Sequence, residues 1–460
     1  MKILADPGHV LEDGLAALRA EVQLPAAFSP AVLAAADAAA ARTPTAHADR
    51  TDRPFVTLDP AASTDLDQAF AIEPAGSDLL LHYAIADVGW FVDDGDVIDQ
   101  EAWQRGTTQY LPDGKVNLYP PVLSEQAASL LPDGPRPAVV FTVRIAPDGA
   151  AMLDGAERAI IRSRAKLGYE TVRDADLPAE FPELARRAAL AEDRRGASRI
   201  DVPEQELERT ADGHFDLRFR PRRIAEDRNA ALSLCANIAI AQTLLAHETG
   251  LFRTMAGPDD RAIQRLRNTA SAYGLSWPRG ATLAQFQRML PPADPRSAAF
   301  AQAVHRAGSG ARYETFEPGV LPWHAAVAAT YAHATAPLRR LADRYVVETT
   351  LAIANGQAVP EAAQAAFTTL PKVMARADSL GGRIERAAID LAETVILRGQ
   401  EGRRFAAIVT DVDERGARIQ LRDLPIVTRL ARDGLVPGTA LDVRLADVDL
   451  SKRTLRFESD

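Results

Sequence analysis

The sequence predicts an α+β protein in three parts: a small helical segment, a large mixed domain and a closing all-β barrel. Three observations support this division. Helical patterns come first, strand-like runs followed by long helical stretches come next, and five short strand signals fill the last 60 residues. At 460 residues the chain is too long for one ordinary core, so two or three domains are expected.

The first 50 residues predict two short helices, over 8–24 and 29–41, which suggests a small helix-turn-helix-like module. Ser29 followed by Pro30 is a typical N-cap and first-turn pair. The stretch RTPTAHADRTDRP that follows, residues 42–54, is expected to be a linker.

Strand signals begin at FVTLD (55–59) and continue in LLLHYAIAD (79–87) and in a hairpin of 138–145 with 158–164. From about residue 226 to about 400 the pattern is helical. Its first part is apolar nearly all round, which predicts a core helix that Gly250 ends.

The last part predicts five strands separated by turn residues, at 404–412, 417–421, 425–430, 440–448 and 454–458. Five strands in this length suit a small closed barrel of the OB type, and an SH3-like barrel is the alternative. The expected domains are therefore 1–50, a helical module with a linker, 51–400, the main domain, and 401–460, the barrel.

The composition, with 47% hydrophobic and 25% charged residues, is that of an ordinary soluble globular protein. No apolar run approaches the roughly 20 residues of a membrane span, and the amino terminus lacks the apolar core of a signal peptide. The single cysteine, Cys235, excludes an internal disulfide framework and a cysteine-rich zinc site. These features predict a cytoplasmic protein with no membrane partner.

The formal net charge of −10 argues weakly against a nucleic-acid partner, although local patches decide binding more than the total does. The basic residues are overwhelmingly arginine, and lysine is scarce. This bias fits bidentate phosphate contacts, but the abundance of alanine favours a GC-rich genome as its cause.

The stretch FVTLDPAASTDLDQAF, residues 55–70, places Asp59, Asp65 and Asp67 within nine positions beside apolar residues. A solvated turn would explain them, because Pro60 and Ser63 are turn residues. A calcium loop would not, since counting from Asp65 puts phenylalanine where glycine is needed and glycine where glutamate is needed. The remaining explanation is a hard-cation site, in which Mg²⁺ removes the repulsion between the carboxylates.

A second segment, YAHATAPLRRLADRY (331–345), predicts a helix that begins near Pro337, runs to Asn355-Gly356 and carries Arg339 and Arg340 in its first turn. The helix dipole disfavours arginine there unless an anion such as phosphate docks at that end. The alternative is a surface arginine pair in a salt bridge with Asp343. An acidic metal site together with arginines at a helix N-terminus indicates phosphodiester chemistry.

These motifs resemble the signatures of the catalytic (RNB) domain of the ribonuclease II family. The aspartates of FVTLDPAASTDLDQAF share the family's spacing, and five segments follow in family order: HYAIADVGWFV, VIDQEAWQRGTTQYLP, NLYPPVLSEQAASLLP, YAHATAPLRRLAD and LGGRIERAAIDLAE. The resemblance covers roughly residues 52–400. The closing barrel resembles the S1-type RNA-binding OB domain that usually ends family members.

The resemblance implies a monomeric, processive 3′-to-5′ exoribonuclease that hydrolyses single-stranded RNA to nucleoside 5′-monophosphates with Mg²⁺, or with Mn²⁺. It implies that Asp59, Asp65, Asp67 and the amide of Gln68 hold metal, and that Asp67 is the carboxylate most critical for activating water. Arg339 would stabilise charge on the phosphoryl oxygens in the transition state. The RNA contacts that it implies are those of Tyr110, which would stack on a terminal base, and of His333, Thr335, Arg340 and Glu385. The residues alone favour a half-buried strand tyrosine for Tyr110, and the helical context of Glu385 also permits a plain surface charge.

Two departures from the family pattern affect this expectation. Gln68 stands where the family usually has a fourth aspartate, and an amide oxygen ligates a hard cation without adding charge. The roughly 50 residues before the catalytic region read as helices, whereas bacterial members often carry two OB domains that gate RNA entry. Because two short helices cannot form such a gate, we expect this protein to trim into structured RNA from a 3′ overhang. The alternative is a catalytically weak RNA-binding paralogue, for which Gln68 is the main indication.

Overall fold

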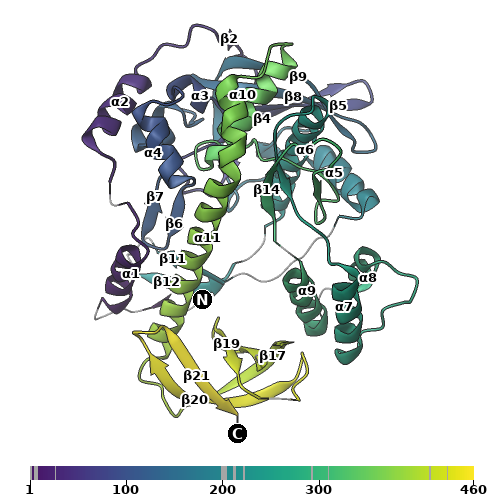
Figure 1. Cartoon of the computed structure of the whole chain (residues 1–460). Coiled ribbons are helices and arrows are strands. Elements are labelled where there is room, and N and C mark those ends of the chain that lie inside the picture. The colour runs from purple at the N-terminus through teal and green to yellow at the C-terminus, as the bar shows by residue number, and fades with distance from the viewer. Residues whose placement is uncertain are drawn as a thin grey trace.

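The computed structural model describes the chain except residues 1–2, 5–8, 26, 198–204, 211–213, 221–222, 292–293, 309, 414–415, 433 and 460. Figure 1 shows a large upper body, a small barrel below it, and a long helix, α11 (Glu361–Leu397), that connects them. At 1.5 Å per residue, its 37 residues span about 55 Å.

The upper body is built on a seven-stranded sheet whose strands lie in the order β10-β3-β4-β5-β8-β9-β2. The outer pairs β10–β3 and β2–β9 are parallel, and the inner pairs are antiparallel. The strands are β2 (Ala48–Asp49), β3 (Phe55–Asp59), β4 (Gln68–Ala75), β5 (Asp78–Ala86), β8 (Arg136–Ile145), β9 (Ala151–Ile161) and β10 (Ser163–Gly168). The strands predicted at 55–59, 79–87 and 138–145 are confirmed, and the one at 158–164 covers the end of β9 and the start of β10.

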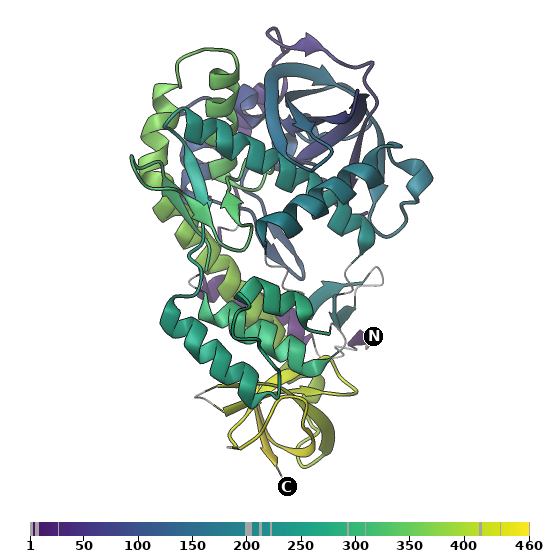
Figure 2. The ribbon, with the colours of Figure 1, turned by 90° about the vertical axis from the view of Figure 1, so that its right-hand side faces the viewer.

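Helices cover this sheet, and Figure 2 shows the sheet with its helices from the side. They are α3 (Val88–Phe91), α4 (Val97–Arg105), the π-helical turn η1 (Leu123–Ala127), the 3-10 turn η2 (Asp174–Asp176), α5 (Phe181–Arg195), α6 (Ile224–Ala246) and α10 (Leu341–Ala354). Helix α6 is long and apolar enough to cross a membrane, but half of its most apolar window is buried inside the protein. It packs against α5, β9 and α10, which confirms the predicted core helix.

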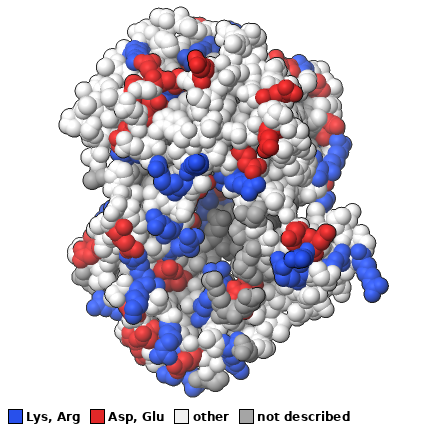
Figure 3. Space-filling model, in the orientation of Figure 1, with Lys and Arg blue, Asp and Glu red and all other residues white. Residues whose placement is uncertain are grey.

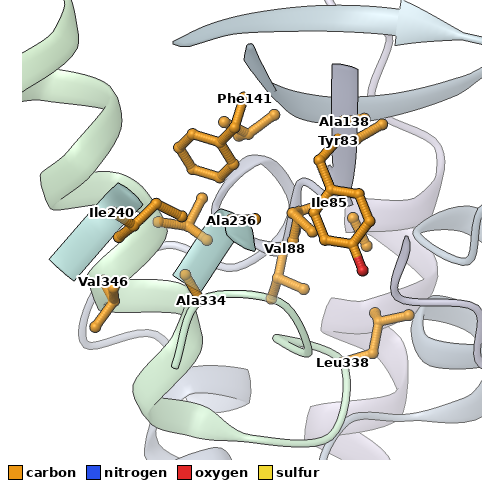
Figure 4. Packing of buried hydrophobic residues seen from close by; sticks show 14 of the residues in the cluster. Tyr83, Ile85, Val88, Ala138, Phe141, Ala236, Ile240, Ala334, Leu338 and Val346 are labelled. Atoms are coloured by element: carbon orange, nitrogen blue, oxygen red, sulfur yellow. The ribbon is translucent and has the colours of Figure 1, made fainter. Parts of the chain in front are cut away.

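The central core lies between the sheet and these helices, and it reaches the loop before α10. Figure 4 shows Tyr83 and Ile85 of β5 in one cluster with Ala334 and Leu338 of that loop. Leu338 is 1% exposed, so apolar packing fixes the position of the residue that follows it, Arg339.

Helical structure does not fill the whole stretch from 226 to 400. Between α6 and α10 lie α7 (Asp260–Ala272), α8 (Leu283–Met289), α9 (Pro295–Ala307) and the strand pairs β13 (Leu251–Thr254) with β14 (Arg312–Thr315) and β15 (Trp323–His324) with β16 (Ala329–Thr330). The expectation of helix was wrong at these strands. β13 pairs with a strand about 60 residues away, and a local pattern cannot reveal such a partner.

The C-terminal barrel has the five predicted strands, antiparallel in the order β19-β18-β17-β20-β21. They are β17 (Arg404–Asp413), β18 (Gly416–Leu421), β19 (Val427–Leu430), β20 (Ala440–Asp449) and β21 (Thr454–Ser459). The first strand pairs with the fourth, and β19 also contacts β21, which closes the sheet. This order is that of an OB barrel and excludes the SH3-like alternative, in which the first strand pairs with the last.

The two N-terminal helices are confirmed as α1 (Val10–Glu21) and α2 (Pro30–Ala40), and Ser29 caps α2 as expected. They pack on different parts of the molecule, α1 against the lower half of α11 and α2 against α4 (Figure 1). They therefore differ from a helix-turn-helix pair, whose two helices pack on each other. Three further short strands lie near α1 and α11, with β12 (Phe215–Phe219) between β1 (Ile3–Leu4) and β11 (Gln205–Arg209).

Candidate active site

The three predicted carboxylates lie at one end of the sheet, on β3 and on the loop that leads to β4. Asp59 ends β3, and the loop carries Asp65 and Asp67 back to β4. Ser129 holds this loop, since its hydroxyl donates to the carbonyl of Thr64 at 2.7 Å and accepts the N–H of Leu66 at 2.9 Å. Ser129 thus fixes the second half of the loop, while Pro60 to Ser63 form a mostly exposed turn, in which the N–H of Ser63 donates to the carbonyl of Pro60 at 2.9 Å. The turn that the sequence offered as an explanation is therefore present, and the buried Asp67 lies beyond it.

Burial sets the charge state of two of these carboxylates. It raises the pKa of Asp59 to about 7 and that of Asp67 to about 8. Asp65 raises the pKa of both further, and Arg339 lowers both. The three carboxylates and the arginine therefore lie within electrostatic reach of one another, as the sequence predicted.

Arg339 reaches Asp67 from a turn, not from a helix. The backbone N–H of Leu338 donates to Asp67 Oδ1 at 2.7 Å, and Arg339 Nε lies 3.4 Å from Asp67 Oδ2. Helix α10 begins only at Leu341, and residues 337–339 form a turn before it. The predicted placement of both arginines in the first helical turn is wrong, because Arg340 takes an extended conformation and bridges to Thr107.

Arg340 forms a structural ion pair with Asp343. Its Nε and Nη2 atoms donate to the two carboxylate oxygens of Asp343 at 2.9 and 2.7 Å. Asp343 also accepts the N–H of Ala336 at 2.8 Å and is fully buried. The salt bridge that the sequence offered as the alternative is therefore present for Arg340, and only Arg339 is aimed at the carboxylates.

His333 and Thr335, on the same segment, pack inward. His333 Nδ1 hydrogen-bonds with the hydroxyl of Tyr313 at 2.8 Å, and burial holds the pKa of this histidine well below its ordinary value. Thr335 is 3% exposed and accepts from Asn237 Nδ2 at 3.4 Å. These contacts shape the segment that carries Arg339, and the RNA contacts predicted for both residues stay predictions.

The oxygen atoms of the aspartates and of Gln68 suit a hard cation whose remaining coordination positions are filled by substrate and water. Gln68 starts β4 and accepts a hydrogen bond from Tyr83 through its side-chain oxygen. Within the described part of the chain, no three His, Cys, Asp or Glu side chains are grouped closely enough to hold an ion by themselves. Mg²⁺ commonly binds one or two carboxylates together with phosphate oxygens and water, so the half-buried Asp59 and the buried Asp67, both short of positive charge, fit it.

Sequence reasoning missed two lysines beside the cluster. Lys115 Nζ lies 2.8 Å from Asp65 Oδ1 and 3.0 Å from Glu125 Oε1. Lys166 donates to the carbonyl of Ala61 at 2.9 Å and lowers the pKa of Asp59. A signal was available: the sequence contains only five lysines, and two of them lie here. Lysine places a compact point charge, which suits a cluster of separate carboxylates.

A groove of about 650 Å³ runs from β6 (Gln109–Leu111) along α11. Tyr110 and Glu385 both line it, together with Arg253 and Asp378, which form an ion pair at 3.1 Å. Tyr110 is 54% exposed, and its hydroxyl lies 3.4 Å from Asp65 Oδ2, so this tyrosine links the groove to the carboxylates. Figure 3 shows lysine and arginine side chains round a hollow beside the course of α11.

The comparisons with known proteins agree with this geometry. The RNB domain profile matches residues 47–354, and the profile of the RNase II-type exonuclease C-terminal S1 domain matches residues 403–459. The chain therefore belongs to the RNB-domain exoribonuclease family.

Among curated relatives, Exoribonuclease 2 of Cronobacter sakazakii is 30% identical over 399 residues, covering 82% of this chain and 61% of that protein. Ribonuclease R of Aquifex aeolicus is 28% identical over 399 residues, covering 80% of this chain and 55% of that protein. The chain thus spans little more than half the length of these relatives.

Solved structures share the fold over the whole chain. RNase R of Mycoplasma genitalium in complex with ribose methylated single-stranded RNA has a TM-score of 0.87 at 19% identity, covering 100% of this chain and 79% of that one. Its complex with double-stranded RNA has a TM-score of 0.84 at 20% identity and covers 100% and 85%. Yeast Ssd1, described as a pseudonuclease, has a TM-score of 0.69 at 17% identity and covers 90% and 53%.

Proposed function

We propose that this protein is a 3′-to-5′ exoribonuclease that hydrolyses RNA processively to nucleoside 5′-monophosphates with Mg²⁺, or with Mn²⁺. The observation that carries the proposal is the meeting of Asp59, Asp65, Asp67 and Arg339 beside Tyr110, which lines a groove together with Glu385. The related exoribonucleases support it. A monomer acting in the cytoplasm is part of the same proposal.

In this proposal Asp59, Asp65 and Asp67 hold the metal with the amide oxygen of Gln68. When bound, the ion supplies a water of lowered pKa and neutralises charge on the phosphate. The N–H of Leu338 donates to Oδ1 of Asp67, which orients the carboxylate without blocking its second oxygen.

Arg339 and the groove residues then place and stabilise the substrate. The side chain of Arg339 is 41% exposed, and its guanidinium carries two-pronged donors that match phosphoryl oxygens. Tyr110 offers an exposed ring for stacking on the terminal base, which any base can use. Glu385, which is exposed on α11 and lines the groove, accepts hydrogen bonds from ribose hydroxyls in this proposal.

The test is incubation of 5′-labelled single-stranded RNA with Mg²⁺. The proposal expects the full-length strand to give way to a short 5′-labelled end product with few intermediates, nucleoside 5′-monophosphates detected by chromatography, and no cleavage in EDTA. Internal cuts, or products with 3′-phosphates, would reject it.

A second candidate function is that of a catalytically weak RNA-binding protein. Two observations favour it: Lys115 already neutralises Asp65, and Gln68 replaces an acid with an amide that Tyr83 engages. A likeness in fold to a pseudonuclease adds to it. Tight binding of RNA with no release of mononucleotides, at any Mg²⁺ or Mn²⁺ concentration, would select this candidate.

We further propose that the enzyme trims into structured RNA from a 3′ overhang. The two helices before β3, α1 and α2, lie against α11 and α4. Among proteins of this fold, one has been solved with double-stranded RNA. Opening a duplex costs about 1.4 kcal/mol per base-pair step, which removal of one nucleotide at a time can overcome. In a series of overhangs on one hairpin, digestion should continue into the stem, and a stop several unpaired nucleotides short of it would contradict this.

A further inference from the structure

The β6–β7 hairpin brings two side chains to a single carboxylate. Strands β6 (Gln109–Leu111) and β7 (Gly114–Val116) are antiparallel, and Tyr110 pairs directly with Lys115. Residues paired in this way project on the same face of a hairpin. The hydroxyl of Tyr110 lies 3.4 Å from Asp65 Oδ2, and Lys115 Nζ lies 2.8 Å from Asp65 Oδ1.

The base of the hairpin is fixed to the segment that carries Arg339 and to α11. The N–H of Thr108 donates to the carbonyl of Arg339 at 3.0 Å. Gln109 Nε2 donates to the carbonyl of Ala377, on α11, at 3.3 Å. These bonds hold the start of β6, but they lie on the side of the hairpin opposite to its turn.

The turn of the hairpin is held by helix α1. Asp113, in the turn, accepts two hydrogen bonds from Arg19, from Nη2 at 2.8 Å and from Nε at 3.2 Å. The side chains are 29% and 22% exposed, so water screens this bidentate pair only in part.

Helix α1 is itself a firm support for that contact. Its residues Leu11, Leu15 and Leu18 are buried in a cluster with the lower half of α11. Gly14 faces Leu391 so closely that a β-carbon there would lie 2.5 Å from the leucine side chain. Figure 1 shows α1 beside α11, below the β6–β7 hairpin.

We propose that Arg19 is a positioning residue for the active site: by holding Asp113 it keeps the β6–β7 hairpin where Tyr110 meets the terminal nucleotide. Two strands of three residues do not hold a fixed position in water by themselves, so the place of this hairpin depends on its anchors. The inference rests on the proposed function and gives the N-terminal helix α1 a part in substrate binding.

The test measures the KM and kcat of Arg19→Ala on a short single-stranded oligoribonucleotide. We expect KM to rise roughly three- to tenfold with kcat changed less than twofold, because the terminal base loses a pre-positioned ring. In the same variant, RNA with a 3′-terminal 2-aminopurine, bound in EDTA, should show less fluorescence quenching than with wild type.

Two matched variants separate positioning from general stability. Glu21→Ala breaks the ion pair of 2.6 Å between α1 and Arg453 of the barrel, leaves Arg19 in place, and should leave KM and quenching unchanged. The exchange of charges in the double variant Arg19→Asp/Asp113→Arg should restore KM to within about twofold of wild type.

An unchanged KM and unchanged quenching in Arg19→Ala would overturn the inference, and so would an equal rise of KM in Glu21→Ala. If wild type releases no mononucleotides, the proposed function fails, and the quenching measurement in EDTA still decides whether Arg19 positions the hairpin.

Discussion

Two arginines five residues apart, Arg339 and Arg344, lie in opposite environments. Arg344 is 2% exposed and forms ion pairs with Asp94, Asp99 and Glu348 at 2.6, 2.8 and 3.2 Å. Arg339 is 41% exposed, and within the described residues its one ion pair is the 3.4 Å contact with Asp67.

The carboxylates of the two regions differ in the same way. Asp99 accepts from Arg344 at 2.8 Å, from the hydroxyl of Tyr345 at 3.0 Å and from the N–H of Gly95 at 2.8 Å. Asp67 is as deeply buried, yet burial raises its pKa to about 8, so its charge is poorly compensated. Charges that are fully paired stabilise the fold, whereas charges left underpaired in a groove are available to a ligand.

The largest effect is expected from Asp67→Asn, which keeps the shape of the side chain and removes its charge. We expect kcat to fall by roughly a thousandfold or more, because both metal binding and water activation depend on that charge. RNA binding, measured by fluorescence anisotropy in the same buffer, should be unchanged or tighter. Cleavage near the wild-type rate would show that the site lies elsewhere.

Arg339→Lys should have a smaller effect, on turnover more than on affinity. A point charge cannot reproduce the planar, two-pronged donor, so we expect kcat to fall about ten- to a hundredfold while the Kd for RNA changes by less than threefold. Equal losses in both constants would assign Arg339 to ground-state binding of RNA. Arg340→Lys does not serve as the control, because Asp343 accepts hydrogen bonds from two guanidinium nitrogens of Arg340, Nε and Nη2.

Stability should depend on pH through the same carboxylates. The native pKa values of about 7 and 8 for Asp59 and Asp67 lie above the ordinary 3.8, so the native state binds more protons than the unfolded state between about pH 4 and 8. Since one pKa unit corresponds to about 1.4 kcal/mol, the free energy of unfolding without metal should fall by several kcal/mol as pH rises through this window.

The Tm in EDTA, measured across this pH window, reports the change in stability. The difference in Tm between wild type and Asp67→Asn separates the contribution of Asp67 from that of other groups. Added Mg²⁺ should raise the Tm of wild type more at pH 8 than at pH 5, since the carboxylates are charged only at the higher pH. A difference between the two proteins that does not change with pH would contradict the charge assignment.

The smallest effect is expected from Gln68→Asp. A carboxylate adds charge to the metal site, so the Mg²⁺ concentration for half-maximal activity should fall by about three- to tenfold. Gln68→Glu, which carries the same charge on a longer side chain, is the matched control for position. If the Mg²⁺ concentration for half-maximal activity is unchanged or rises, then Gln68 supports Tyr83 and does not ligate the metal.

The predictions made from sequence succeeded where the information was local. The end of β3 at Asp59 and the five barrel strands follow from alternating patterns and turn residues. The predicted start of α10 was wrong, because Arg340 forms a β-bridge with Thr107, which lies more than 200 residues away in the sequence. Lys115 was missed for a similar reason: its contact with Asp65 spans 50 residues and depends on the register of the β6–β7 hairpin.

The contrast between the two arginines is tested most directly by one paired measurement on Arg339→Met and Arg344→Met: the Tm, and the single-turnover rate of mononucleotide release per folded molecule. We predict that Arg339→Met keeps the Tm within about 2 °C of wild type and loses at least a hundredfold in rate. Arg344→Met should lose several degrees in Tm, since it leaves buried carboxylates unpaired, and should keep the rate within about threefold. If Arg339→Met cleaves like wild type, or if both variants lose stability and rate together, the underpaired site is not the catalytic one.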